Sequence, residues 1–311
     1  MRVLMIFFDG WGLGPNDPAV NPFLTHPMPT LRGLFGGAMP TSGNGHFESA
    51  RATLVPTDAT LGVPGLPQSA TGQTTIFTGV NAPRAIGEHL GPYPNAALRK
   101  ILAHDNIFMR LAAANRRTAF ANAYPPIFFE RLARDKARRS ATSYAAHAGN
   151  VRYRDIDDLR AGRAVSAFVT NDRWSKIPRS SAGHSAGADV PLITAYDAGR
   201  NLARLANEHD FTLFEYFLTD AAGHKAKPEF TAFVLNEVDE LLRGVLDEID
   251  LATSLVITTS DHGNLEDTSG KRHTLNPVPT LLIGAGHERI APRIHALTDL
   301  TPAMVDLILE K

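Results

Sequence analysis

Apolar runs rich in β-branched residues recur along the chain and predict the buried strands of a sheet. The clearest runs are residues 3–8, 212–218, 255–259 and 280–283. They lack the polar alternation of a half-exposed strand, which is typical of parallel strands covered on both faces. A further strand is expected at residues 52–55, inside a stretch that is otherwise rich in Gly, Pro, Ser and Thr.

Between these runs, apolar residues recur at the spacing of amphipathic helices. Such stretches cover residues 95–114, 197–207 and 228–248, and a closing helix is expected from about residue 301. The helix that begins at Pro228 has a predicted apolar side, which comprises Phe233, Val234, Val238, Leu241, Leu242 and Val245. Because strands and helices alternate, we predict an α/β fold with a doubly wound, mostly parallel sheet.

Residues 121–190 differ in kind from the rest of the chain. They are dense in arginine, broken by small polar residues, and end in the run SSAGHSAGAD at 180–189. We interpret this stretch as a small cap inserted over the carboxyl edge of the sheet, so that residues 1–120 and 191–311 form the two parts of the core. Most of its arginines are expected to be solvated, with two or three facing a ligand. They are Arg131, Arg134, Arg138, Arg139, Arg152, Arg154, Arg160, Arg163, Arg173 and Arg179.

The glycines within residues 10–14 resemble a dinucleotide-binding loop, but their context excludes that function. Such a loop needs a helix whose N-terminus holds a pyrophosphate. Here Pro15, Pro18 and Pro22 interrupt any helix, and the glycine spacing is one residue short. We therefore expect no nicotinamide or flavin cofactor.

Composition narrows the chemistry further. Lys and Arg number 31 against 32 Asp and Glu, so no overall field would recruit nucleic acid or an anionic membrane. The absence of cysteine excludes disulfides, thiolate metal sites and thiol nucleophiles. No apolar run approaches the roughly 18 residues of a membrane span, and residues 3–8 are too short for a signal-peptide core. A soluble, cytoplasmic protein is predicted.

Three aspartates follow predicted strands, and three histidines accompany them. Because the carboxyl ends of parallel strands meet at one edge of a sheet, we expect these six side chains to converge there. They are Asp9, Asp220, Asp261, His224, His262 and His273. Carboxylate and imidazole ligands suit Zn²⁺ or Mn²⁺. Two such ions, about 3.5–4 Å apart, could clamp a phosphoryl group and activate a nucleophile.

A serine at the start of a predicted helix is the candidate nucleophile. Residues 67–75 read PQSATGQTT and lead into a short helix that stops at Gly79. Ser69 would then lie at a helix N-terminus, where free N–H groups favour an anion. The alternative is a serine that only caps the helix. No P-loop lysine follows, so this is not a Walker-type cradle for a nucleoside triphosphate.

Five motifs together resemble the alkaline phosphatase superfamily, and within it the cofactor-independent phosphoglycerate mutases and phosphopentomutases. They are FFDGWG at 7–12, the segment around Ser69, TDAAGH at 219–224, SDHGN at 260–264 and HTLNPVP at 273–279. The motifs lie at both ends of the chain in the family's order. The last two are nearly those of the phosphoglycerate mutases.

The resemblance implies two divalent ions, Mn²⁺ or Zn²⁺, and assigns ligands to each. Asp220, His224 and His273 would bind one ion. Asp9, Asp261 and His262 would bind the other, and Ser69 would bridge to it and become phosphorylated. Asn264 and Asn276 would orient ligands rather than bind metal themselves, and Gln73 is expected to act in the same way.

Two departures from the family bear on the predicted activity. The mutases carry Gly-His shortly after the nucleophile, whereas Gln73 follows Gly72 here. The predicted cap is also much shorter than the second domain of the phosphoglycerate mutases, so water would reach a phosphoserine more easily. We therefore predict a phosphomonoester hydrolase that acts on a small phosphorylated metabolite through Ser69. A phosphomutase is the alternative, followed by a sulfate- or phosphonate-ester hydrolase and a non-catalytic metal-binding protein.

Overall fold

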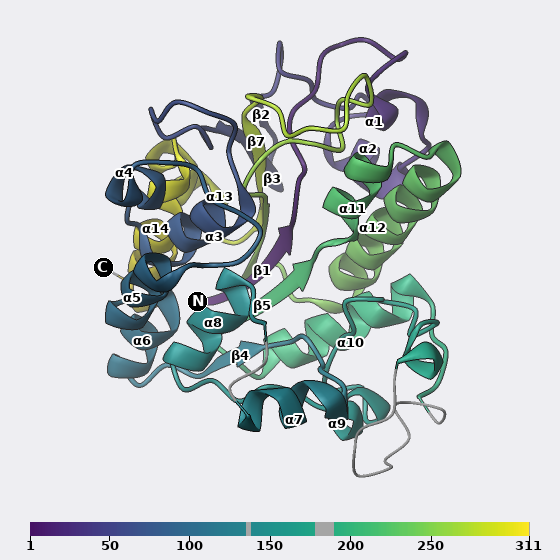
Figure 1. The fold of residues 1–311 in the computed structure, drawn as a ribbon. Helices are drawn as coiled ribbons and strands as arrows, with labels where there is room; N and C mark the ends of the chain where they lie inside the picture. Colours follow the sequence, from purple (N-terminus) through teal and green to yellow (C-terminus); the bar gives the residue numbers. More distant parts are fainter. Residues whose placement is uncertain (135–137, 178–189, 311) are drawn as a thin grey trace.

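The computed structural model describes residues 1–134, 138–177 and 190–310. In these residues seven strands form one sheet in the order β2-β3-β7-β6-β1-β5-β4, which runs through the middle of the molecule (Figure 1). The strands are β1 (Arg2–Phe8), β2 (Phe47–Glu48), β3 (Ala52–Thr57), β4 (Thr118–Phe120), β5 (Phe211–Tyr216), β6 (Ser254–Thr259) and β7 (Val278–Gly284). Strand β1 is parallel to β5 and β6, and β4 is parallel to β5, whereas β7 is antiparallel to both β6 and β3. The predicted α/β fold with a mostly parallel sheet is confirmed.

Alternate side chains of β1 enter two separate hydrophobic cores, as the pleat of a strand requires. Leu4, Ile6 and Phe8 pack in the core that contains α10 (Ala195–Asn207) and α12 (Pro228–Glu248). Val3, Met5 and Phe7 pack in the core that contains α3 (Ser69–Thr78) and α14 (Leu300–Leu309). Figure 1 shows these two helical layers on opposite faces of the sheet. The sheet is therefore covered on both sides, which explains why its strands do not alternate apolar and exposed polar residues.

Most predicted helices are present, with two corrections. The stretch 95–114 forms two helices, α5 (Ala96–His104) and α6 (Ile107–Ala113), because Asn106 caps the start of the second one. In α12 the predicted core residue Phe233 is 43% exposed, so that assignment was wrong. Buried residues of α12 follow the stripe Val234, Val238, Leu241, Leu242 and Val245. Phe233 lies beside this stripe and stacks on Phe230 instead.

The predicted cap stretch contributes to the molecule in two ways. It forms α7 (Pro126–Ala133), α8 (Ala141–Ala148), α9 (Ile156–Arg160) and the 3-10 helix η1 (Trp174–Lys176). Helix α8 places Ala141 and Ala145 in the same core as α3, whereas Trp174 and Leu159 belong to a small separate cluster. The domain division at 120 and 190 remains a prediction. Arg179 and the run at 180–189 lie outside the described residues.

The remaining elements complete the chain. They are α1 (Pro22–Thr25), α2 (Pro29–Leu34), α4 (Ala82–Ile86), α11 (Leu218–Lys225), α13 (His287–Ile290), η2 (Ala291–Arg293) and η3 (Leu297–Asp299). Among the described helices, none is both long enough and apolar enough to cross a membrane.

Candidate metal centre

The loops that leave β1 and β6 bring two carboxylates and an imidazole together. Asp9 directly follows β1, and Asp261 and His262 follow β6. Nε2 of His262 lies 3.2 Å from Oδ1 of Asp9 and 3.7 Å from Oδ1 of Asp261. All three residues are buried. They are the three residues that the resemblance assigns to one ion, and their ligand atoms are close enough to share one.

A second group adjoins the first on its solvent side. Asp220 lies in the first turn of α11, because β5 ends at Tyr216 rather than at residue 218 as predicted. Nε2 of His224, one turn further along α11, lies 3.3 Å from Oδ2 of Asp220 and 3.2 Å from Nε2 of His273. Nε2 of His273 is 3.7 Å from Oδ1 of Asp220. The three residues assigned to the other ion therefore also lie together.

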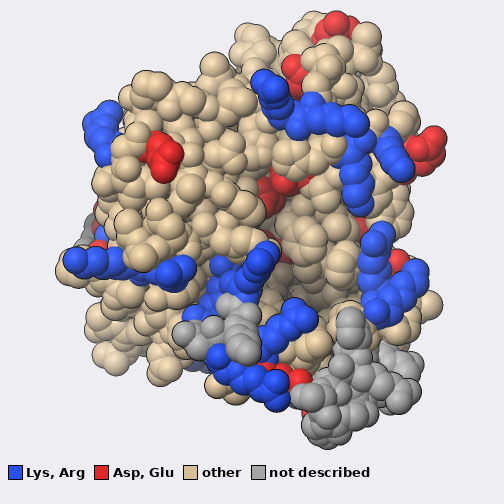
Figure 2. Space-filling view, viewed as in Figure 1, with Lys and Arg blue, Asp and Glu red and all other residues tan. Residues whose placement is uncertain are grey.

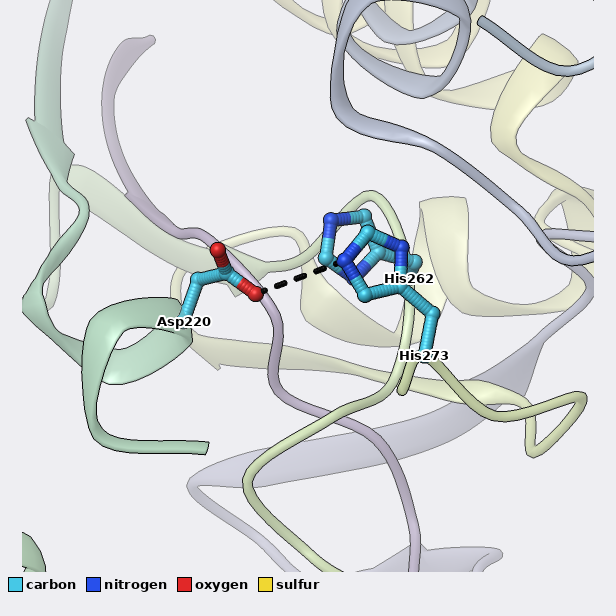
Figure 3. A group of neighbouring side chains, drawn as sticks. All are labelled: Asp220, His262 and His273. Atoms are coloured by element: carbon cyan, nitrogen blue, oxygen red, sulfur yellow. Dashed lines mark ion pairs between the residues drawn. The ribbon is translucent and has the colours of Figure 1, made fainter. Parts of the chain in front are cut away.

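His262 joins the two groups. Its ring stacks on that of His273 at 3.6 Å between centroids, and Figure 3 shows both rings directed at Asp220. Asp220, His262 and His273 themselves have ligand atoms close enough to hold one ion. Two adjacent ligand groups with one residue between them are the arrangement that a two-metal centre requires.

The titratable groups of the centre shift one another's pKa. Burial, and then repulsion from Asp261, raise the pKa of Asp9 well above its ordinary value. Burial alone would lower the pKa of His262, but Asp261 and Asp9 outweigh burial and raise that pKa to about 10. Burial and the neighbouring His262 lower the pKa of His273 to about 4. The carboxylates of Asp9 and Asp261 thus favour a positive charge at the buried position between them.

The donor set fits divalent ions. Oδ1 of Asp9 is buried and accepts no hydrogen bond from the described residues, and its contact within 3.2 Å is the ring of His262. A buried carboxylate oxygen without a hydrogen bond is costly unless a cation contacts it. The rings of His273 and His224 both turn Nε2 toward the centre, because Nδ1 of each ring lies beside a backbone carbonyl. Nδ1 of His273 lies 2.7 Å from the carbonyl of Pro67, and Nδ1 of His224 lies 3.0 Å from that of Lys271. Metal-binding histidines are commonly oriented by such a contact on the far nitrogen.

Ser69 lies beside this centre as the first residue of α3. Gln68 is the N-cap residue, so Ser69 does not serve as the helix cap. Its Oγ is 3.1 Å from Nε2 of His262. The hydroxyl thus faces the predicted metal ligands at the positive end of a helix dipole, where a phosphate is stabilised.

The predicted orienting residues differ in how closely they approach the ligands. Nδ2 of Asn264 donates to Oδ1 of Asp220 at 2.6 Å. Nε2 of Gln73 donates to Oδ2 of Asp261 at 3.1 Å and to Oδ2 of Asp9 at 3.4 Å. Asn276 is one step further away, because its Nδ2 donates to Oε1 of Glu266 at 3.0 Å.

Glu266 is a structural residue of the centre that the sequence reasoning missed. Its buried carboxylate accepts hydrogen bonds from the backbone amides of Gly12 at 2.9 Å and Asn264 at 2.7 Å. It thereby ties the loop after β1 to the loop after β6. Its place two residues after Asn264, in the same acidic segment, was the available signal.

Two further buried residues near the centre were also missed. Glu215 is the single charged residue of the otherwise uncharged strand β5, and this was a readable signal. Thr142, in the first turn of α8, gave no signal in the sequence. Both lie on the side of the sheet covered by α3 and α8.

Close approach of the loops to α3 depends on a glycine. A Cβ atom at Gly72 would lie 2.7 Å from Cβ of Asp261 and 2.8 Å from its carbonyl oxygen. The lack of a side chain at this position lets α3 bring Ser69 and Gln73 against the strand ends.

Figure 2 shows acidic side chains in the floor of a hollow, with Lys and Arg side chains around it. Carboxylates at the bottom of a hollow that is edged by cations suit an anionic substrate whose charge is offset by metal ions.

Comparisons with known proteins agree with this geometry. Over 127 residues the chain is 32% identical to a 2,3-bisphosphoglycerate-independent phosphoglycerate mutase of Acetivibrio thermocellus, which covers 38% of this chain and 24% of the mutase. A mutase of the same name from Syntrophotalea carbinolica is 24% identical over 194 residues, which cover 60% of this chain and 37% of the mutase. The chain thus matches well under half the length of these curated relatives.

The fold is also that of a solved phosphatase. The alkaline phosphatase of the Antarctic bacterium TAB5 superposes with a TM-score of 0.53 at 13% identity, over 99% of this chain and 97% of the phosphatase. The model of one family, described as the metalloenzyme superfamily, matches residues 1–310. The predicted family resemblance is therefore confirmed, and the chain belongs to the metalloenzyme superfamily.

Proposed function

We propose that this chain is a phosphomonoester hydrolase that transfers the phosphoryl group of a small metabolite to Ser69. The observation that carries the proposal is the position of Ser69 Oγ, 3.1 Å from His262 Nε2 at the N-terminus of α3. Few reactions need a hydroxyl there, next to two groups of carboxylates and imidazoles. Phosphoryl transfer is one, because its transition state gathers negative charge on the oxygens around phosphorus.

The reaction would proceed in two steps. Ser69 Oγ would lose its proton and form a bond to phosphorus while the ester P–O bond breaks, and the leaving oxygen would take up a proton, which balances the one that Ser69 gives up. Water would then attack the phosphoserine, release inorganic phosphate and restore the hydroxyl. The first amides of α3 would stabilise the phosphoryl oxygens. Divalent ions held by the two ligand groups would supply Lewis acidity and favour the ionised serine.

A phosphomutase is the second candidate, and the curated relatives favour it because they are named phosphoglycerate mutases. A mutase must keep water away from its phosphoserine while the substrate reorients. Gln73 stands where the mutases carry histidine, and the predicted cap is short, so we place hydrolysis first. Neither candidate depends on the ions being Mn²⁺ rather than Zn²⁺.

Phosphorus NMR separates the two candidates. The protein, loaded with Mn²⁺ or Zn²⁺ and then freed of paramagnetic excess, is incubated with 3-phosphoglycerate, with ribose 5-phosphate and with an aryl phosphate. We expect free phosphate to exceed isomerised product with 3-phosphoglycerate and with ribose 5-phosphate, and free phosphate to be released from the aryl phosphate. Stoichiometric isomerisation with negligible free phosphate would instead establish the mutase.

Replacement of the nucleophile tests the chemistry itself. Ser69→Ala should abolish turnover, while the melting temperature stays within a few degrees of that of the wild type because the side chain is small. Ser175→Ala is a matched control on the exposed surface of η1 and should retain full activity. A Ser69→Ala variant with a near wild-type rate would show that water attacks the phosphate ester directly.

A further inference from the structure

Gln73 links the nucleophile helix to two predicted metal ligands. Its side chain extends from α3, is 1% exposed, and donates from one nitrogen toward both Asp9 and Asp261. A carboxamide can turn either its oxygen or its NH2 group toward a neighbour. Facing two carboxylates, only the NH2 group is favourable, and the oxygen would be repelled.

Thr142 supports the amide in that orientation. Its hydroxyl donates to Oε1 of Gln73 at 3.2 Å, and the Thr142 side chain is fully buried. If the amide turned over, its NH2 group would face the hydroxyl and its oxygen would face Asp9 and Asp261. The hydroxyl proton of Thr142 therefore favours the same orientation of the Gln73 amide as the two carboxylates do.

Thr142 is itself held in place by the start of α8. Ser140 caps this helix by accepting from the amide of Ser143, and its hydroxyl donates to Oε2 of Glu215 at 3.1 Å. Glu215 lies at the end of β5, two strands away from the Asp261 loop. The first turn of α8 is thus fixed to the sheet on one side and contacts Gln73 on the other.

We propose that Thr142 and Gln73 form a positioning pair, which orients the Asp9 and Asp261 carboxylates so that their Oδ1 atoms, which Gln73 does not contact, converge on one divalent ion. Gln73 brings two N–H donors without adding charge, so it holds the carboxylates together and leaves their attraction for the ion intact. A histidine or lysine in the same place would carry positive charge when protonated and compete with the ion. The inference goes beyond the proposed function, because it holds for any reaction at this centre.

The test compares metal binding by isothermal titration calorimetry in protein that has first been freed of metal with a chelator. Thr142→Val keeps the shape of the side chain and removes the hydroxyl, whereas Thr142→Ser keeps the hydroxyl. We expect Thr142→Val to weaken the binding of Mn²⁺ or Zn²⁺ to the Asp9 and Asp261 site by about tenfold, at the lower end of the effect of residues that orient metal ligands. Thr142→Ser should stay within about threefold of the wild type.

A matched control is available in α12. Thr231 is also buried, and its hydroxyl has no hydrogen-bond partner among the described residues. Thr231→Val should leave metal affinity unchanged. Gln73→Met, which fills the same space without donors, should weaken binding at least as much as Thr142→Val. Because Thr142 acts through Gln73, the double variant should bind no more weakly than Gln73→Met alone.

Several results would overturn the inference. One is an unchanged affinity in Thr142→Val or in Gln73→Met. Another is a loss of metal affinity in the double variant that equals the sum of the two single losses. A third is a melting temperature that falls equally with and without metal while the metal affinity is unchanged, because this result would show a merely structural role. If Thr142→Val does not fold, Gln73→Met alone decides the question. Substrate is absent throughout, so the result is independent of whether Ser69 proves to be the nucleophile.

Discussion

Glu215 should make the stability of the metal-free protein fall as the pH rises. Burial is the main cause that raises its pKa from 4.5 to about 7, and the nearby Asp261 charge adds to it, whereas the hydrogen bond from Ser140 opposes it. Between these values the folded protein keeps a proton that the unfolded chain has lost. The free energy of unfolding therefore declines with pH over this range and levels off above about pH 7.

The magnitude follows from the size of the pKa change. One pKa unit corresponds to about 1.4 kcal/mol, so a rise from 4.5 to about 7 corresponds to a loss of about 3 kcal/mol. Glu215→Gln cannot ionise and should lack this loss. The difference in the free energy of unfolding between Glu215→Gln and the wild type should therefore shift by about 3 kcal/mol in favour of the variant between pH 4 and pH 8.

The assay is urea unfolding of both proteins in chelator at several values between pH 4 and pH 8. Subtracting the two curves removes the contributions of other titrating groups, including the raised pKa values of Asp9 and Asp261. Glu88→Gln, at an exposed position, is a control and should give a pH profile parallel to that of the wild type. Parallel pH profiles for the wild type and Glu215→Gln would refute the reasoning.

Two other predictions follow from the same structure. Asp261→Ala or His262→Ala should lose the ion assigned to Asp9, Asp261 and His262. His224→Ala or His273→Ala should lose the ion assigned to Asp220, His224 and His273. Both losses are measured by elemental analysis after reconstitution with Mn²⁺ and Zn²⁺. Each loss should lower the melting temperature in excess metal, because an ion present at about 100 times its Kd stabilises the fold by about 2.7 kcal/mol; finding no bound metal in the wild type would contradict the assignment. In α12, Leu241→Ala should cost about 2–5 kcal/mol in urea unfolding. Phe233→Ser, at a position that is 43% exposed, should cost much less, and equal losses would contradict the observed packing of this helix.

How much the sequence could predict depended on the range of the interactions involved. The strands and α12 were readable because their side chains repeat with the local period of the element. Phe233 was misplaced because one residue at the border of a helical stripe can face either way. The break between α5 and α6 was missed because Asn106 acts through a capping hydrogen bond rather than through hydrophobicity.

The candidate centre shows the same division. Asp9, Asp220 and Asp261 could be brought to one edge because each follows a predicted apolar strand, and parallel strands end at one edge. Thr142 could not be placed there, because it comes from the predicted cap stretch and reaches the centre only through the packing of α8 against α3. The division of the ligands between two ions needed the family motifs, and His273 in particular follows a loop whose path no local pattern describes.

The measurement that tests the central claim most directly is mass spectrometry of the metal-loaded protein, quenched with acid during turnover of an aryl phosphate. The account predicts a phosphoryl group on the peptide that contains Ser69, present in the wild type, absent without metal and absent in Ser69→Ala. Rapid release of phosphate with no modified Ser69 at any quench time would contradict it.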